Sequence, residues 1–338
     1  GGKSSLRGWM FAAAFDRVIR DDVADASAGE EALQGVLSTR FFLAKDRWVG
    51  LYYVYRSQNH DDGKFLRVNV IDVATDLHFG AKGAGLRVQA EGVAIMGTTS
   101  LAPSPDYPEH DISQLAGAAR ISYDVGEAGL RFGLDLGWFS GDDALDDGTV
   151  HNFKADPNFQ QGLVLFRRVL GWQTGRARLT ASNPDVVGQP NDDLERLATG
   201  GSVTSALTVF PKLGIHLNDH IEVYGGALIA VATAQPTDPF HTRTIGGGEP
   251  RNFLGEVPAD RMLGTELLVG ARAVIPVRSL HSAVWFGLEV GQLVAGGALA
   301  GLDEAGPIQG GRLVLAFTPW KDETNKTDKT DKTDEEQR

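Results

Sequence analysis

Apolar and polar residues alternate along much of this chain, which is the pattern of β-strands with one buried face. The clearest stretch is residues 130–138, where large apolar side chains take every second position and Arg131 and Asp135 stand between them. Residues 115–124 and 86–91 repeat the alternation, whereas no segment shows a long 3.6-residue period. The pattern therefore predicts an all-β protein.

The connections between these stretches alternate in length. Short connections rich in Gly, Asp, Asn and Lys, as tight hairpins require, occur at 44–47, 81–85, 125–129, 171–175, 217–220 and 278–282. Longer acidic or Pro/Gly-rich connections occur near 20–34, 57–64, 98–113, 140–158, 183–201, 235–262 and 297–310. The runs between them number about fourteen, and many approach the roughly 9–11 residues with which a tilted strand crosses a bilayer.

An even number of strands, with short turns at one end and long loops at the other, is typical of outer-membrane barrels. We therefore predict a transmembrane antiparallel β-barrel of about 14 strands over residues 1–320, with short periplasmic turns and long extracellular loops. Residues 321–338 contain a Lys-Thr-Asp repeat and no apolar side chain. They are predicted to form a disordered polar tail.

Tryptophan placement favours the same interpretation, because aromatic girdles mark the two membrane interfaces of such barrels. Each tryptophan falls at or near a predicted strand end: Trp9, Trp48, Trp138, Trp172, Trp285 and Trp320. The alternative is a soluble sandwich whose core is capped by aromatic residues, but a sandwich has no reason to alternate short and long connections so regularly.

Composition and charge narrow the function classes. Of the 338 residues, 42 are Gly, which argues against a helical bundle. A formal charge of -12 argues against nucleic acid as a partner. The absence of Cys excludes disulfides and thiolate metal sites. There is no apolar run of about 18 residues, so a transmembrane helix is not expected.

Loose motifs support a family resemblance. They are residues 152–159 (NFKADPNF) leading into 163–167 (LVLFR), residues 263–266 (LGTE), and the closing strand 311–317. With these residues, the chain resembles the porin-like outer-membrane β-barrels of myxobacteria and related Gram-negative bacteria, and more distantly the alginate-export type of barrel. The resemblance implies a pore or a structural role in the envelope, and it supplies no catalytic residues.

Motifs of enzyme chemistry are nearly absent. Gly83-Ala84-Gly85 lacks the third glycine of a dinucleotide fingerprint and opens a strand. His216 and His220 flank one turn and are interpreted as solvated. We therefore predict no enzyme, no catalytic residues, no cofactor and no metal. Acidic doublets in the long loops could bind Ca²⁺ or the ions that cross-link lipopolysaccharide, or could simply be solvated: Asp61-Asp62, Asp142-Asp143, Asp146-Asp147 and Asp192-Asp193.

Polar side chains opposite the apolar stripes carry the strongest functional signal. If the strands form a barrel, this alternation would direct a set of polar side chains into the lumen: Arg87, Gln89, Glu91, Arg120, Asp124, Arg131 and Asp135. The arginines fall near the short turns, and Arg176 and Arg178 would be similarly placed two strands further on. Two interpretations remain open: a basic strip that favours anions, or arginines that pair with Glu91, Asp124 and Asp135 as a structural ladder.

From these observations we predict a porin-like channel in the bacterial outer membrane for passive passage of small hydrophilic solutes, with the arginines favouring anions. Its partners would be outer-membrane lipid, lipopolysaccharide and a small solute. One alternative is a closed barrel acting as a structural or adhesive scaffold, with its lumen filled by large side chains or by an inward-folded loop such as 235–262. Another is an outer-membrane hydrolase, which would need a Ser/His/acid cluster at one rim.

Overall fold

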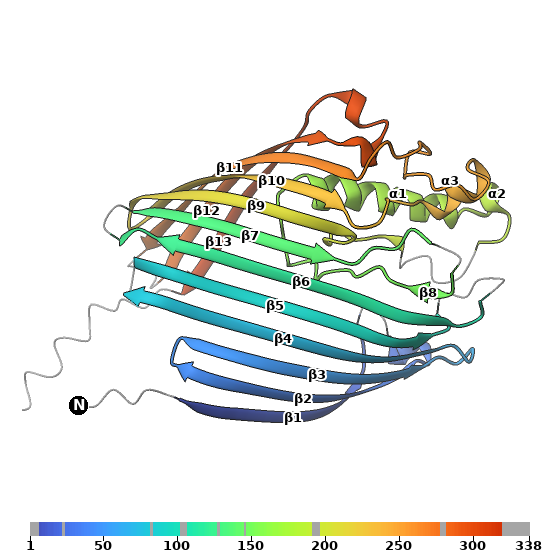
Figure 1. Cartoon of the computed structure of the whole chain (residues 1–338), viewed down its shortest axis with the longest axis horizontal. Coiled ribbons are helices and arrows are strands. Elements are labelled where there is room, and N and C mark those ends of the chain that lie inside the picture. Colours follow the sequence, from blue (N-terminus) through green and yellow to red (C-terminus); the bar gives the residue numbers. More distant parts are fainter. Residues whose placement is uncertain are drawn as a thin grey trace, which may run out of the picture.

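The computed structural model describes residues 7–21, 24–81, 84–101, 107–126, 129–144, 147–190, 197–277 and 282–319. Within them the chain forms one large antiparallel sheet (Figure 1). Its first seven strands are β1 (Gly8–Val18), β2 (Glu31–Ala44), β3 (Arg47–Asn59), β4 (Phe65–Ala81), β5 (Ala84–Thr99), β6 (His110–Asp124) and β7 (Leu130–Phe139). The later strands are β9 (Ala206–Asn218), β10 (Ile221–Ala232), β11 (Met262–Val277), β12 (Ser282–Ala295) and β13 (Ile308–Pro319).

These strands pair with their neighbours in chain order, and the two-residue strand β8 (Thr149–Val150) joins parallel to β6. The all-β prediction is therefore confirmed. Short turns connect β2 to β3, β4 to β5, β6 to β7, β9 to β10, and β11 to β12. They lie at one end of the sheet, here called the short-turn end, where β1 also begins and β13 ends. The longer connections and the helices lie at the opposite, long-loop end (Figure 1). The predicted alternation of connection lengths is thus confirmed for five of the six predicted short turns.

The sixth predicted turn, 171–175, is wrong, and so are the two strands predicted on either side of it. Leu165–Leu170 is a π-helical segment that runs directly into α1 (Gly171–Ala181), followed by α2 (Pro184–Val187). Residues 140–205 therefore form one long connection between β7 and β9. In the described residues the sheet has twelve long strands and the short β8, instead of about fourteen.

The remaining helical elements are short and also belong to the long connections. They are α3 (Pro239–Thr244) and three 3-10 turns, Ala26–Ala28, Gly297–Leu299 and Asp303–Ala305. Asn183 and Asp238 cap α2 and α3, because their side chains accept backbone N–H bonds from Asp185 and His241. These two short helices therefore follow local capping signals that a period of two does not reveal, whereas α1 has no side-chain cap.

The sheet curves strongly about its own long axis. Arg87 on β5 and Arg312 on β13 line the same cavity although many strands separate them in the sheet order. Their shared side is the concave face. Among the described residues no ladder joins β1 to β13, so the sheet is open between these two edge strands. Closure into a barrel stays a prediction.

An apolar core fills the concave face at the long-loop end. Residues 153–170, here called the inner segment, contribute Leu163, Leu165 and Phe166, each at most 2% exposed. These side chains pack with concave-face residues of four later strands, including Leu228 and Leu293. The inward-folded part of the chain thus comes from the β7–β9 connection, not from 235–262. It closes much of the long-loop end with packed side chains.

Candidate functional site

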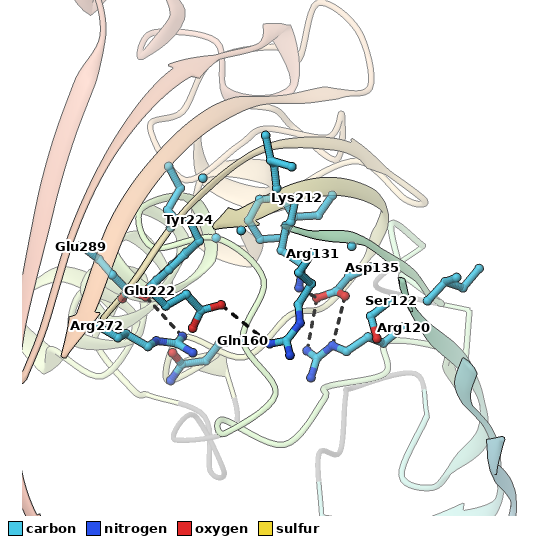
Figure 2. A pocket seen from close by; sticks show the side chains of 18 of the residues that line it. Arg120, Ser122, Arg131, Asp135, Gln160, Lys212, Glu222, Tyr224, Arg272 and Glu289 are labelled. Atoms are coloured by element: carbon cyan, nitrogen blue, oxygen red, sulfur yellow. Dashed lines mark hydrogen bonds and ion pairs between the residues drawn. The ribbon is translucent and has the colours of Figure 1, made fainter. Parts of the chain in front are cut away.

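A polar cavity of about 780 Å³ occupies the concave face toward the short-turn end (Figure 2). Six cationic side chains among the described residues line it: Arg87, Arg120, Arg131, Lys212, Arg272 and Arg312. Four anionic side chains accompany them: Asp124, Asp135, Glu222 and Glu289. The cavity therefore has more positive than negative groups although the whole chain is acidic. Its volume falls within the range of small-molecule sites, about 300–1,000 Å³.

Strand register explains why residues distant in sequence meet here. Gln89 on β5 stands opposite Arg120 on β6, and Arg120 stands opposite Asp135 on β7. Because side chains alternate between the two faces, opposite residues share a face. Most of the residues predicted to face the lumen line this cavity: Arg87, Gln89, Arg120, Asp124, Arg131 and Asp135. Glu91 lines an adjoining cavity of about 300 Å³.

Asp135 is shared by two cations. Arg120 donates from Nε to Asp135 Oδ1 at 3.1 Å and from a terminal nitrogen to Oδ2 at 3.2 Å. Lys212 on β9 donates from Nζ to the same Oδ2 at 2.6 Å. The Asp135 side chain is only 5% exposed, whereas that of Arg120 is 53% exposed. The carboxylate is thus buried in the wall, while the arginine keeps a surface toward the cavity.

Glu289 on β12 forms a similar cluster on the other side of β10. Arg312 on β13 donates from Nε to Glu289 Oε2 at 2.6 Å, and a terminal nitrogen of Arg272 lies 3.9 Å from Oε1. The Tyr224 hydroxyl donates to Glu289 Oε1, and the Arg272 guanidinium lies 4.6 Å from the Tyr224 ring centroid. Here again two cations share one buried carboxylate, so the cluster keeps a positive excess facing the cavity.

The other arginines are paired along the wall. Arg131 donates from Nε to Asp124 Oδ1 at 2.5 Å and lies 3.7 Å from Glu222. Arg87 binds both oxygens of Asp76 on β4, at 2.9 and 2.6 Å, so its carboxylate partner is Asp76, not Glu91 as the predicted ladder had it. The ladder exists for Asp124 and Asp135, and it is combined with a cationic surplus. The pairing interpretation is therefore confirmed for Asp124 and Asp135, whereas a preference for anions stays a prediction.

The inner segment forms the floor of the cavity at its long-loop side. Asn158, Phe159, Gln160 and Gly162 line it, and Gln160 Oε1 accepts a hydrogen bond from Arg312 at 2.9 Å. Gly162 has a φ of 73°, and a Cβ there would lie 2.7 Å from a Glu266 oxygen. A side chain at this position would meet both backbone strain and a clash. Glycine therefore lets the segment turn against the wall.

A buried carboxylate anchors the inner segment just beyond that turn. Glu266 on β11 is fully buried and accepts backbone N–H bonds from Leu163, Val164 and Leu165 at 2.5, 3.0 and 2.9 Å. Free N–H groups at the start of a helical turn bind anions well. Residues 263–266 and 163–167 are two of the family-like motifs, and the structure brings them together.

Several site residues were missed at the sequence level: Lys212, Glu222, Tyr224, Arg272, Glu289 and Arg312. The signal for them was present, since Glu289 stands between the exposed Leu288 and Val290 and Arg312 precedes the exposed Leu313. The same alternation that identified Arg131 applies to these strands. Their pairing depends on cross-strand register, which the alternation alone does not supply.

The arginines predicted further along are placed differently. Arg176 and Arg178 lie on α1, not on a strand beside a short turn. Arg176 donates to the Phe253 carbonyl at 3.2 Å, and its guanidinium lies 5.0 Å from the Trp172 ring centroid. Neither arginine lines the cavity. The basic strip therefore continues through Lys212 and Arg272 instead.

The tryptophans follow the strand ends with one exception. Trp9, Trp48, Trp138 and Trp285 lie near the ends of β1, β3, β7 and β12, as predicted. Trp172 is on α1, so its predicted position at a strand end is wrong, and Trp320 lies outside the described residues. Trp48 lines the adjoining cavity on the concave face. The position of these residues at a membrane interface stays a prediction.

The described acidic doublets do not come together as a metal site. Asp142 accepts backbone N–H bonds from His151 and Ala144. Burial raises the pKa of Asp142 above its usual value, although these two hydrogen bonds lower it. Lys64 pairs with Asp62 at 3.4 Å. Asp146, Asp192, Asp193 and residues 321–338 lie outside the described residues. Within the described ranges no three His, Asp or Glu side chains gather as metal ligands would.

A scan against protein-family models finds no match to this chain, and a search of curated proteins finds no similar sequence. The predicted resemblance to porin-like barrels therefore rests on the residues that suggested it. In the part of the chain that the structure describes, no helix combines the length and the hydropathy needed to cross a bilayer.

Proposed function

We propose that the chain is a closed β-barrel of the bacterial outer membrane that passes small anionic solutes through its polar interior. The observation that carries the proposal is the cavity on the concave face, where cations outnumber carboxylates and two carboxylates are each shared by two cations. Charges that line a narrow space act on an ion with little screening, so a positive surplus favours anions.

Residence in a membrane is supported by the convex face. Large apolar side chains point outward from the middle of many strands, among them Leu267 at 59% and Leu313 at 66% exposed. Monomeric soluble proteins rarely expose apolar patches of more than a few hundred Å². Lipid would cover this face, while the polar concave face would stay hydrated.

The cost of two open edges in a membrane supports closure of the sheet. β1 and β13 each present unpaired backbone groups on one side, and in hydrocarbon every such group must find a partner. Both strands have their free edge where the curved sheet ends, and β1 begins at the short-turn end where β13 ends (Figure 1). An antiparallel β1–β13 ladder would complete a barrel of twelve long strands.

The route of a solute would run beside the inner segment. That segment packs mainly against β9–β12, whereas cavities of about 300 and 260 Å³ lie along β2–β7. The larger of the two shares Gln89, Arg120 and Asp135 with the main cavity. A solute entering from the short-turn end would therefore meet the cationic clusters first and then the narrower space beside the inner segment.

Planar-bilayer recording of the full chain under a KCl gradient tests this proposal. We expect an anion-selective reversal potential for the wild type and a shift toward cations when Arg87, Arg120 and Arg131 are all changed to Glu. Changing Arg176, Arg178 and Arg243 to Glu is the matched control, because these arginines lie on α1 and α3 away from the cavity. A conducting wild type without anion preference would contradict the proposal.

A closed structural scaffold is the second candidate, favoured by the packed apolar core around the inner segment. Phe153, Leu165 and Phe166 are buried against the concave face. The recording separates the two functions. If the barrel inserts but conducts no ions, both as the wild type and as a variant without the Glu266 carboxylate, the scaffold function would be favoured.

A further inference from the structure

One arginine of the main cavity keeps its N–H groups largely free. The Arg272 side chain on β11 is 53% exposed, and no described carboxylate oxygen lies nearer to its guanidinium than Glu289 Oε1, at 3.9 Å. That separation exceeds hydrogen-bond distance. The other described arginines of the cavity each donate to a carboxylate at 3.1 Å or less: Arg87, Arg120, Arg131 and Arg312. Arg272 is therefore the arginine that the wall engages least.

Both carboxylates near Arg272 are engaged by other cations. Glu289 Oε2 accepts from Nε of Arg312 at 2.6 Å. Glu222 stands opposite Arg272 in the β10–β11 ladder, but its carboxylate lies 3.7 Å from Arg131. The positive charge of Arg272 is thus the surplus of this side of the cavity, and its donors remain available to a ligand.

The wall also holds the Arg272 guanidinium against an aromatic ring. Its central carbon lies 4.6 Å from the Tyr224 ring centroid. Gly270 precedes Arg272 by two residues on the same face of β11, and a Cβ there would lie 2.6 Å from Tyr224 Cζ. Only glycine therefore lets the ring lie close against the wall at this point. Since the N–H bonds lie in the guanidinium plane, contact with the ring face leaves them free for an anion.

We propose that Arg272 determines the specificity of the cavity by binding a small oxyanion through two parallel N–H···O bonds. The inference deepens the proposed function, on which it rests, because it names the class of anion: a carboxylate or a phosphate in preference to a halide. The planar guanidinium fork matches two oxygens on one carbon or phosphorus atom, whereas a halide offers a single centre.

The surroundings of Arg272 leave room for such a ligand and supply a further donor. Its neighbour on β12 is Gly287, where a Cβ would meet no listed atom nearer than 3.7 Å, so the wall is open on that side. Gln160 of the inner segment lines the same cavity. Its Oε1 accepts from Arg312, which leaves the Gln160 Nε2 as a donor for an oxyanion.

Isothermal titration of the full chain in detergent and chloride buffer, with acetate and with phosphate, tests the inference. We expect the wild type to bind at least one of them in competition with chloride. Arg272→Lys keeps the charge but loses the fork, and it should weaken that binding about tenfold, as the loss of one charge-assisted hydrogen bond allows. Arg176→Lys is the matched control and should change nothing, because Arg176 also lies over an aromatic ring, that of Trp172, but outside the cavity.

The two oxyanions identify the source of the ligand. Binding of acetate alone would assign the site to carboxylates, and binding of phosphate alone to phosphate groups. No binding of either to the wild type, or equal affinities in the wild type and Arg272→Lys, would overturn the inference. Arg272→Gln, which removes both charge and fork, is a second variant and should abolish the binding.

Failure of the proposed function would be recognised separately. The reversal potential in KCl measures selectivity for charge in the absence of any oxyanion, so it does not depend on the titration. Anion selectivity in KCl without oxyanion binding would overturn the Arg272 site alone. Oxyanion binding to a channel without anion preference in KCl would contradict the proposed passage of anions.

Discussion

Glu266 and Leu163 are 103 positions apart in the chain, and Glu266 Oε1 accepts the Leu163 backbone N–H at 2.5 Å. The other carboxylate oxygen accepts the next two N–H groups, of Val164 and Leu165. A buried charge is costly unless hydrogen bonds compensate it. One side chain on β11 therefore determines where the inner segment turns and where its helix begins.

Removing this anchor should release the inner segment. Glu266→Ala leaves three buried N–H groups unpaired, each costing about 1–3 kcal/mol, so we expect a loss of at least about 3 kcal/mol. The measurement is denaturant unfolding in detergent, together with protease cleavage within 140–205. Glu249→Ala, at an exposed position in another long connection, is the control and should change neither quantity. Unchanged stability and cleavage in Glu266→Ala would show that the segment is held without this carboxylate.

The cluster around Asp135 predicts opposite effects for its members. Asp135→Asn removes a buried anion from between Arg120 and Lys212. Since both cations are partly exposed, we expect a loss of only about 1–2 kcal/mol, less than for a fully buried pair. The same change should increase anion selectivity in planar bilayers, whereas Lys212→Gln should decrease it. Shifts of the reversal potential in the same direction for both variants would contradict a cavity controlled by local charge.

The convex face should tolerate a charge only near the ends of its strands. Leu288 lies in the middle of β12 and is exposed, and Gln292 lies on the same face nearer the long-loop end. In a lipid bilayer Leu288→Arg should cost about 2–4 kcal/mol, and Gln292→Arg about 0–1 kcal/mol. Unfolding from lipid vesicles measures both. Equal costs for the two variants would argue that hydrocarbon does not cover this face.

Cysteine cross-linking can test the closure of the sheet, because the natural chain has no Cys to interfere. Ala14 lies near the middle of β1. Three residues near the middle or in the short-turn half of β13 are candidate partners: Arg312, Val314 and Ala316. We expect Ala14→Cys to form a disulfide with Cys at one of these three β13 positions in the membrane-inserted chain, since paired Cα atoms lie within about 7 Å.

Pairing Ala14→Cys with Cys at the exposed Val186 of α2 is the control, and no cross-link is expected there. Cross-links that form only between two copies of the chain would show that the edges pair between molecules. Absence of any β1–β13 cross-link would argue against a closed twelve-strand barrel.

Much of this structure could be predicted from local pattern. The period of two assigns each strand residue to a face because successive side chains point to opposite sides of the pleated backbone. That rule placed Arg120, Arg131 and Asp135 on one face before any neighbour was known. Turn composition likewise located five hairpins, because Gly, Asn and Asp favour the backbone conformations that tight turns require.

Other features were decided only by the tertiary structure. The apolar run 163–166 fits a buried strand as well as a buried helix, since periodicity does not distinguish them over so few residues. Packing against β9–β12 and the three N–H bonds to Glu266 select the helical form. Charge pairing is equally non-local: Arg87 meets Asp76 and Asp135 meets Lys212 because strand register and curvature bring them together. The amino-acid sequence by itself therefore determined which strand residues share a face of the sheet. Only the tertiary structure decided which of these residues are in contact and that the inner segment fills the space between them.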